Sequence, residues 1–233
     1  MRLAVIGNSH VGALKKGWDR SVAAEFPGIS ICWFASPKTR MTEIHPEAGA
    51  LVPRTPELER DIAFTSDGLT RIEADSFDAF LVVGLNRRLE RQIGNFCTPF
   101  SQAARLAALE DYWEGSNHLK LVEKLRRITN KPIHSAHAPL KSGTDGTGGT
   151  AEYETYLTAS NARVFAPIEV ALVPQPADTR VGATRTAPKF AKGSERLETG
   201  RALDGLAHSE DEPFHMNGTY GAIWMRGFLQ TAA

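Results

Sequence analysis

Short apolar runs alternate along this chain with longer segments in which apolar residues recur every three or four positions. Residues 3–6 are continuously apolar, which is typical of a strand buried on both faces. Residues 29–34 and 77–83 predict a second and a third strand, closed by Ser36-Pro37 and by Gly84. Residues 131–138 predict a fourth strand and residues 164–173 a fifth.

Helical spacing follows several of these runs. Residues 11–26 carry an apolar stripe of Val11, Leu14, Trp18, Val22 and Phe26. Residues 101–113 and 117–128 predict two further helices, separated by Gly115, and an amphipathic helix closes the chain. Strands alternating with helices favour a parallel sheet covered by helices on both faces.

Three segments depart from this alternation. Residues 42–75 are rich in proline and weakly periodic, so no structure is predicted for them. A Gly/Thr-rich loop near residues 141–150 and a long polar segment near 174–211 have lengths that usually indicate functional loops or lids. We find no repeat and expect a single domain over residues 1–233.

Composition excludes several classes of function. The 27 Lys and Arg residues balance the 27 Asp and Glu residues, and no basic block occurs, so no nucleic-acid partner is expected. No run approaches the length of a membrane span, and the first apolar run is too short for a secretion signal. We therefore expect a cytoplasmic protein without a membrane partner, in which Cys32 and Cys97 are reduced packing residues.

The turn "GNSH" after the first strand has three alternative interpretations. A phosphate loop would need Lys-Ser/Thr where the chain has Ala13-Leu14, and a dinucleotide fingerprint would need a glycine near Asn8-Ser9. Ser9 is instead placed as a nucleophile at the carboxyl edge of the sheet. Alternatively, Ser9 only caps the helix that follows, as serine commonly does.

The segment "EDEPFH" near the C-terminus supplies partners for a nucleophilic serine. Glu212 precedes His215 by three residues, so one short loop offers an imidazole base and a carboxylate to orient it. A serine hydroxyl needs this help, because it is a weak nucleophile until a neutral imidazole accepts its proton.

These residues carry a resemblance to the SGNH hydrolases, also called GDSL-type esterases. Gly7-Asn8-Ser9-His10 resembles the first block of that family, Gly84-Leu85-Asn86 the G-x-N-D block, and Glu212-Pro213-Phe214-His215 the final D-x-x-H block. The resemblance implies a flavodoxin-like three-layer α/β/α sandwich with a mainly parallel five-stranded sheet. It also implies a Ser-His-acid carboxylic-ester hydrolase without a cofactor, acting on an ester-linked group, such as an O-acetyl group, of a small or carbohydrate-like substrate.

The resemblance assigns a role to each matched residue. Ser9 would be the nucleophile and His215 the general base, and the oxyanion hole would use Asn86, Gly84 and the Ser9 backbone. The family also has an oxyanion-hole glycine after the second strand. This chain has "FASPKTRM" there, and Ser36 occupies the expected place of that glycine.

Two departures from the family pattern bear on activity. Arg87 stands where the family usually has Asp, and Glu212 replaces the usual Asp of the final block, with Asp211 as an alternative. Because of Arg87 and the atypical second block around Ser36, the alternative function is a non-catalytic module that binds a glycan or a partner.

The remaining polar residues are assigned more simply. His10 and Arg87 are expected to line the substrate cleft. His134 and His137 lie three apart on a predicted strand, so their side chains point to opposite faces and no metal site is expected.

Overall fold

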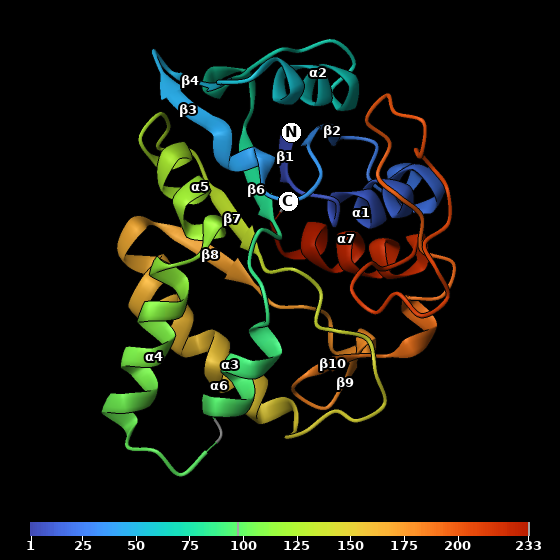
Figure 1. Ribbon diagram of the computed structural model, residues 1–233. Coiled ribbons are helices and arrows are strands. Elements are labelled where there is room, and N and C mark those ends of the chain that lie inside the picture. Colours follow the sequence, from blue (N-terminus) through green and yellow to red (C-terminus); the bar gives the residue numbers. More distant parts are fainter. Residues whose placement is uncertain (97, 233) are drawn as a thin grey trace.

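Five parallel strands form the central sheet of the computed structural model, which describes residues 1–96 and 98–232. Every neighbouring pair in this sheet is parallel, so the predicted parallel α/β architecture is confirmed (Figure 1). The order across the sheet is β2 (Ser30–Ala35), β1 (Arg2–Gly7), β6 (Ala79–Val83), β7 (Ile133–Ala136) and β8 (Val170–Val173).

Two apolar cores lie on opposite faces of the sheet. Leu3 and Val5 of β1 pack with α1 (Val11–Gly17) and α7 (Gly218–Ala232). Ala4 and Ile6 face the larger core. Alternate residues of one strand thus serve both cores, which explains why the run is continuously apolar. The larger core is covered by α2 (Pro56–Thr65), α3 (Leu89–Phe96), α4 (Gln102–Glu114), α5 (Asn117–Arg126) and α6 (Thr150–Ser160).

The proline-rich segment without a predicted structure contains a small antiparallel sheet as well as α2. Its strands are β3 (Ile44–Glu47), β4 (Ala50–Pro53) and β5 (Ile72–Glu73). Pro46 and Pro53 lie within these strands. The strands are short and proline weakens the strand pattern, so no periodic signal identifies them.

Two predicted elements differ from those observed. The fifth strand covers only Val170–Val173, because Asn161–Phe165 continues α6 as a π-helical turn and Ala166–Ile168 is a 3₁₀ turn. The prediction of a strand over residues 164–168 is therefore wrong. A short apolar stretch fits a buried helical turn as well as a strand. The first helix also changes geometry, with a π turn at Trp18–Val22 and a 3₁₀ turn at Ala23–Glu25.

The two long irregular segments contact each other. Residues 174–211 include the hairpin of β9 (Arg180–Val181) and β10 (Arg185–Thr186). The Thr147 carbonyl accepts from the Ala183 amide, and the Thr147 amide donates to the Thr184 hydroxyl. The Gly/Thr-rich loop is thus tied to the second segment at this hairpin.

Cys32 is half-buried against the larger core, whereas Cys97 lies outside the described residues, so the expectation for it stays a prediction. Among the helices of the described residues, none combines the length and the apolar character that crossing a membrane requires.

Candidate active site

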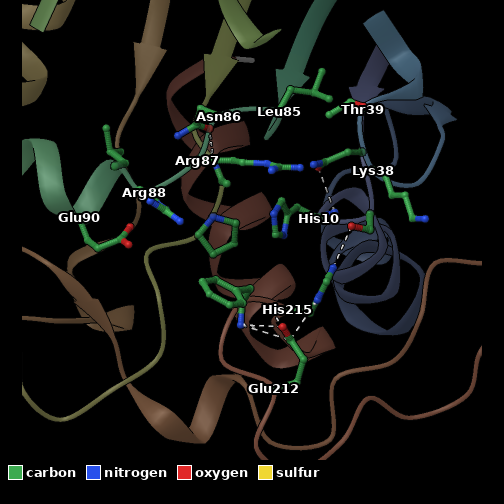
Figure 2. A pocket seen from close by; sticks show the side chains of 16 residues that line it. His10, Lys38, Thr39, Leu85, Asn86, Arg87, Arg88, Glu90, Glu212 and His215 are labelled. Carbon is green, nitrogen blue, oxygen red and sulfur yellow. Dashed lines mark hydrogen bonds and ion pairs between the residues drawn. The ribbon is translucent and has the colours of Figure 1, made fainter. Parts of the chain in front are cut away.

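The carboxyl ends of β1, β6 and β7 converge on a cavity of about 420 Å³ (Figure 2). The cavity is lined by five segments of the chain. Asn8, Ser9 and His10 follow β1, whereas Lys38 and Thr39 follow β2. The turn after β6 and residues 138–139 after β7 complete one side, and the segment before α7 closes the other. This is the edge at which the sequence predicts a site.

Ser9, His215 and Glu212 form a continuous chain of hydrogen bonds. The Ser9 Oγ lies 2.8 Å from the His215 Nε2, and the His215 Nδ1 lies 3.0 Å from a Glu212 carboxylate oxygen. Because the carboxylate only accepts, the neutral ring carries its proton on Nδ1. The Nε2 then accepts the hydroxyl proton of Ser9, which is the arrangement that activates a serine.

Glu212 is held by more than the imidazole. Its carboxylate also accepts from the backbone amides of Phe214, at 3.2 Å, and His215, at 2.7 Å. Although partial burial alone would raise the pKa of Glu212, the hydrogen bonds and the nearby imidazole lower it overall. The group therefore stays ionised near neutral pH. Asp211 is exposed and lies outside the cavity lining, so the structure places Glu212, not Asp211, against His215.

Ser9 does not use its side chain to cap α1. The Ser9 carbonyl accepts from the Gly12 amide, but its hydroxyl is directed to His215. The hydroxyl therefore contacts a base and does not cap the helix.

Helices α1 and α7 explain how residues 206 positions apart meet. A Cβ on Gly17 would lie 2.1 Å from the Ala222 nitrogen, and one on Gly221 would lie 1.7 Å from the Ala13 carbonyl oxygen. The two backbones are thus in direct contact (Figure 1). Ser9 lies just before one helix and His215 just before the other, so this contact brings the two loops together.

Two more imidazoles surround His215. The His10 ring centroid lies 5.1 Å from that of His215, and the His208 ring stacks on His215 at 4.2 Å with an interplanar angle of 12°. Burial and the neighbouring His215 lower the pKa of His10 to about 3. Burial and His215 also lower the pKa of His208. Both neighbours are therefore neutral near neutral pH and place no fixed positive charge beside the base.

His208, Glu212 and His215 also have ligand atoms close enough to bind one metal ion, within 4.8 Å of one another. A metal bound by imidazole lies near the plane of the ring. Two parallel rings 4.2 Å apart do not share such a point, and both His215 nitrogens already have hydrogen-bond partners. The geometry therefore fits a stacked base better than a metal centre.

Asn86 lines the cavity with its amide orientation fixed. Its Oδ1 accepts from the Ala138 amide at 2.6 Å, and its Nδ2 donates to the Tyr112 hydroxyl at 3.0 Å. An amide nitrogen has two hydrogens, so one remains after the bond to Tyr112. That hydrogen is a candidate donor to a developing oxyanion.

The structure corrects two of the predicted oxyanion donors. Ser36 is buried outside the cavity lining, its amide donates to the Gly7 carbonyl, and its hydroxyl donates to Asp61 at 2.6 Å. The Gly84 amide donates to the Ala136 carbonyl. Gly84 is needed for space instead, since a Cβ there would lie 2.3 Å from the Asn8 Oδ1.

Lys38, which lines the cavity together with Thr39, is a position in the second block that the sequence does not identify. Its φ is +63°, a value that normally favours glycine, which is the residue that the family resemblance leads one to expect. Within residues 1–96 and 98–232, neither the Lys38 nor the Ser9 backbone amide has an acceptor. The residue type does not reveal this position, because the left-handed conformation of a lysine is seen only in the backbone of the structure.

The remaining predicted site residues lie where they were expected. His10 and Arg87 both line the cavity. His134 and His137 do point to opposite faces: the His134 ring lies 5.1 Å from that of Phe228 in α7, whereas His137 bonds Tyr153 of α6.

Comparisons with known proteins give no close relative. No family model matches the sequence, and no curated protein matches it. Eight chains of solved structures match the fold.

Three of these structures belong to proteins named as esterases or as an acetyltransferase. A family two carbohydrate esterase from Clostridium thermocellum, solved with cellohexaose, is 11% identical with a TM-score of 0.43, over 99% of this chain and 63% of that one. This chain thus spans less than two thirds of that esterase. The periplasmic domain of a lipopolysaccharide acetyltransferase from Salmonella ser. Paratyphi A is 8% identical with a TM-score of 0.48, over 100% and 84%.

A carbohydrate acetylesterase family member from Sinorhizobium meliloti is 9% identical with a TM-score of 0.34, over 99% and 97% of the two chains. All three structures are less than 25% identical to this chain, with TM-scores below 0.5. At such identities and scores they assign neither a substrate nor an activity to this chain, so the evidence for function is the geometry of the site.

Proposed function

We propose that this protein is a serine esterase of the SGNH type, with Ser9 as nucleophile, His215 as general base and Glu212 as the group that orients the base. The observation that carries the proposal is the pair of hydrogen bonds from Ser9 to His215 and from His215 to Glu212, at 2.8 and 3.0 Å. A serine that only caps a helix or lies on the surface needs neither of these hydrogen-bond partners.

The reaction is acyl transfer to water. Ser9 Oγ attacks the ester carbonyl carbon and its proton passes to the His215 Nε2. The tetrahedral intermediate then loses the alcohol, which takes that proton, and an acyl-serine remains. Water attacks the acyl-serine with His215 again as base, and the acid and free Ser9 are released.

The oxyanion would be stabilised by groups from three loops. They are the backbone amides of Ser9 and Lys38 and the second Nδ2 hydrogen of Asn86. These donors line the cavity in the free protein and keep hydrogens available, so they need little rearrangement when charge develops. The substrate class that we propose is an ester-linked group, such as an acetyl group, on a small polar or carbohydrate-like molecule in the cytoplasm.

Covalent labelling tests the nucleophile directly. The folded protein should form an adduct with an alkyl fluorophosphonate on the peptide containing Ser9, measured by mass spectrometry. Ser9→Ala should lose the adduct and should hydrolyse 4-nitrophenyl acetate at least about 10³-fold more slowly. Ser209→Ala, which changes an exposed serine of the same cavity-side segment, is the matched control and should keep both properties.

The alternative function has its own outcome in this experiment. If the folded protein forms no adduct at Ser9 and hydrolyses no ester, yet binds a glycan, it is a non-catalytic binding module.

A further inference from the structure

The cavity lining carries an excess of positive charge that the hydrolytic chemistry does not need. Lys38, Arg87 and Arg88 all line it, and all three side chains are exposed. Within residues 1–96 and 98–232, none of the three lies within ion-pairing distance of a carboxylate. These cations are therefore available to a ligand.

The carboxylates of the cavity do not offset this charge. Among the described residues, the carboxylates that line it are Glu90 and Glu212, and Glu212 is committed to His215 and to two backbone amides. Three cations thus face a single uncommitted carboxylate, although the whole chain has no net charge. A local excess of one sign in a concave site concentrates ligands of the opposite sign.

The backbone beneath these side chains is held in an unfavourable conformation. Lys38 and Arg88 have φ values of +63° and +60°, and Leu85, in the same turn as Arg88, has +64°. Of the six left-handed non-glycine residues in the described part of the chain, three therefore line this cavity. Such conformations cost free energy and persist where the surrounding structure imposes them, most often at functional sites.

Figure 2 shows the Arg87 side chain extending from the turn after β6 across the cavity, toward the side occupied by Lys38. Arg87 and Arg88 are adjacent in sequence, and both belong to the cavity wall that also contains Asn86. A guanidinium offers paired donors that match the two oxygens of a carboxylate, and it serves a phosphate or sulfate equally.

We propose that the substrate is an anionic ester, with a carboxylate, phosphate or sulfate close to the bond that is cleaved, and that Arg87, Arg88 and Lys38 bind this group. The proposal rests on the proposed esterase function for the cleavage step. Binding of the anion depends only on the cavity and its cations. The charged group belongs either to the alcohol part, as in an esterified acidic sugar, or to the acyl part, as in a dicarboxylic monoester.

Matched substrates test the charge alone. An O-acetylated hexuronate is compared with its hexuronamide, which keeps the acetyl ester and removes the charge from the alcohol part. The 4-nitrophenyl monoester of succinic acid is compared with the 4-nitrophenyl ester of succinamic acid, which keeps the ester and removes the charge from the acyl part. We expect kcat/KM to be about tenfold higher for the anion in at least one pair, and this ratio should shrink with added salt.

Variants locate the source of the preference. Arg87→Gln should reduce the anion-to-amide ratio severalfold, and the double change R87Q with R88Q should bring it close to one. Arg91→Gln, an exposed arginine one turn further along α3 and outside the cavity lining, is the matched control and should keep the ratio. Equal or lower kcat/KM for the anion in both pairs overturns the proposal while the esterase function stands.

Binding separates this proposal from the chemistry. Calorimetry on Ser9→Ala measures the affinity for the acetylated hexuronate and its hexuronamide without turnover. Tighter binding of the hexuronate supports an anion site even in a protein that proves not to hydrolyse esters. If the hexuronate binds no more tightly than the hexuronamide and neither pair is discriminated in turnover, the cations have no such role.

Discussion

At the residue scale, the Glu212 carboxylate has two separate tasks. It fixes the tautomer and orientation of His215 through Nδ1, and it holds the turn that carries His215 through the Phe214 and His215 amides. Asp211, one position earlier, is exposed and performs neither task. Sequence spacing identifies an acid near the histidine, but only the backbone path decides which of two neighbouring acids reaches the ring.

Exchanging each acid for its amide tests this difference. Glu212→Gln keeps the size of the side chain but removes the charge that stabilises protonated His215, so kcat should fall by roughly 10² to 10⁴. Asp211→Asn should leave kcat within about twofold, because its side chain is exposed. Hydrolysis of 4-nitrophenyl acetate by both variants measures the effect. Equal losses in the two variants would contradict the assignment of Glu212.

The oxyanion donors show the limit of prediction at this scale. Ser9 and His215 are found from the sequence, because Ser9 follows a buried strand and His215 lies three residues after an acid, whereas Asn86 is found only through the resemblance to SGNH hydrolases. Ser36 occupies the expected place of a second donor, yet its amide is used by Gly7 and its hydroxyl by Asp61. Lys38, two residues later, lines the cavity instead. Its left-handed backbone conformation cannot be inferred from its residue type.

At the scale of elements, the contact between α1 and α7 joins the nucleophile to its base. Glycines at positions 17 and 221 let the helices approach until any side chain there would overlap the opposing backbone. The apolar stripes of both helices are visible in the sequence. Their pairing is not, because many helices of similar amphipathicity could pack on the same face of a sheet.

A pair of glycines in α7 tests the importance of this approach. Gly221→Ala places a Cβ 1.7 Å from the Ala13 carbonyl oxygen, so it should lower the free energy of unfolding by about 1–3 kcal/mol or more. It should also slow ester hydrolysis, because Ser9 and His215 move apart. Gly227→Ala meets open space in the same helix and should be neutral or stabilising by up to about 1 kcal/mol. Urea unfolding distinguishes them, and comparable stability of the two variants would refute the close contact.

At the scale of the whole molecule, hydrogen bonds of two buried histidines hold the loops of the site in place. His118 of α5 donates from Nδ1 to the Gly84 carbonyl at 2.5 Å and accepts at Nε2 from Ser135 of β7. His137 donates to the Ala138 carbonyl at 2.6 Å and accepts from the Tyr153 hydroxyl at 2.7 Å. Each network requires a neutral imidazole, because one of its nitrogens accepts a hydrogen bond.

These two histidines predict loss of stability in mild acid. Burial lowers the pKa of His118 and of His137 to about 4, whereas an unfolded histidine has a pKa of about 6.5. Below about pH 6.5 the unfolded chain therefore binds protons that the folded protein does not, so stability falls as the pH falls. Each histidine should contribute about 1–2 kcal/mol of loss between about pH 7 and about pH 5.

Urea unfolding at the two pH values measures this loss. His118→Gln should be less stable at neutral pH, because it disturbs the links to Gly84 and Ser135, but its stability should depend less on pH than that of the unmodified protein. An identical pH dependence in both proteins would show that His118 is not kept neutral by folding.

The sequence by itself determined the alternation of strands and helices, the parallel sheet and the turns that carry Ser9, Asn86 and His215. These features are local, because they depend on periodicity and on the residues that end each strand. The tertiary structure alone decided that β1 lies between β2 and β6, that α1 and α7 touch, and that Lys38 rather than Ser36 borders the cavity. Each of these depends on contacts between segments far apart in the chain, which local patterns do not encode.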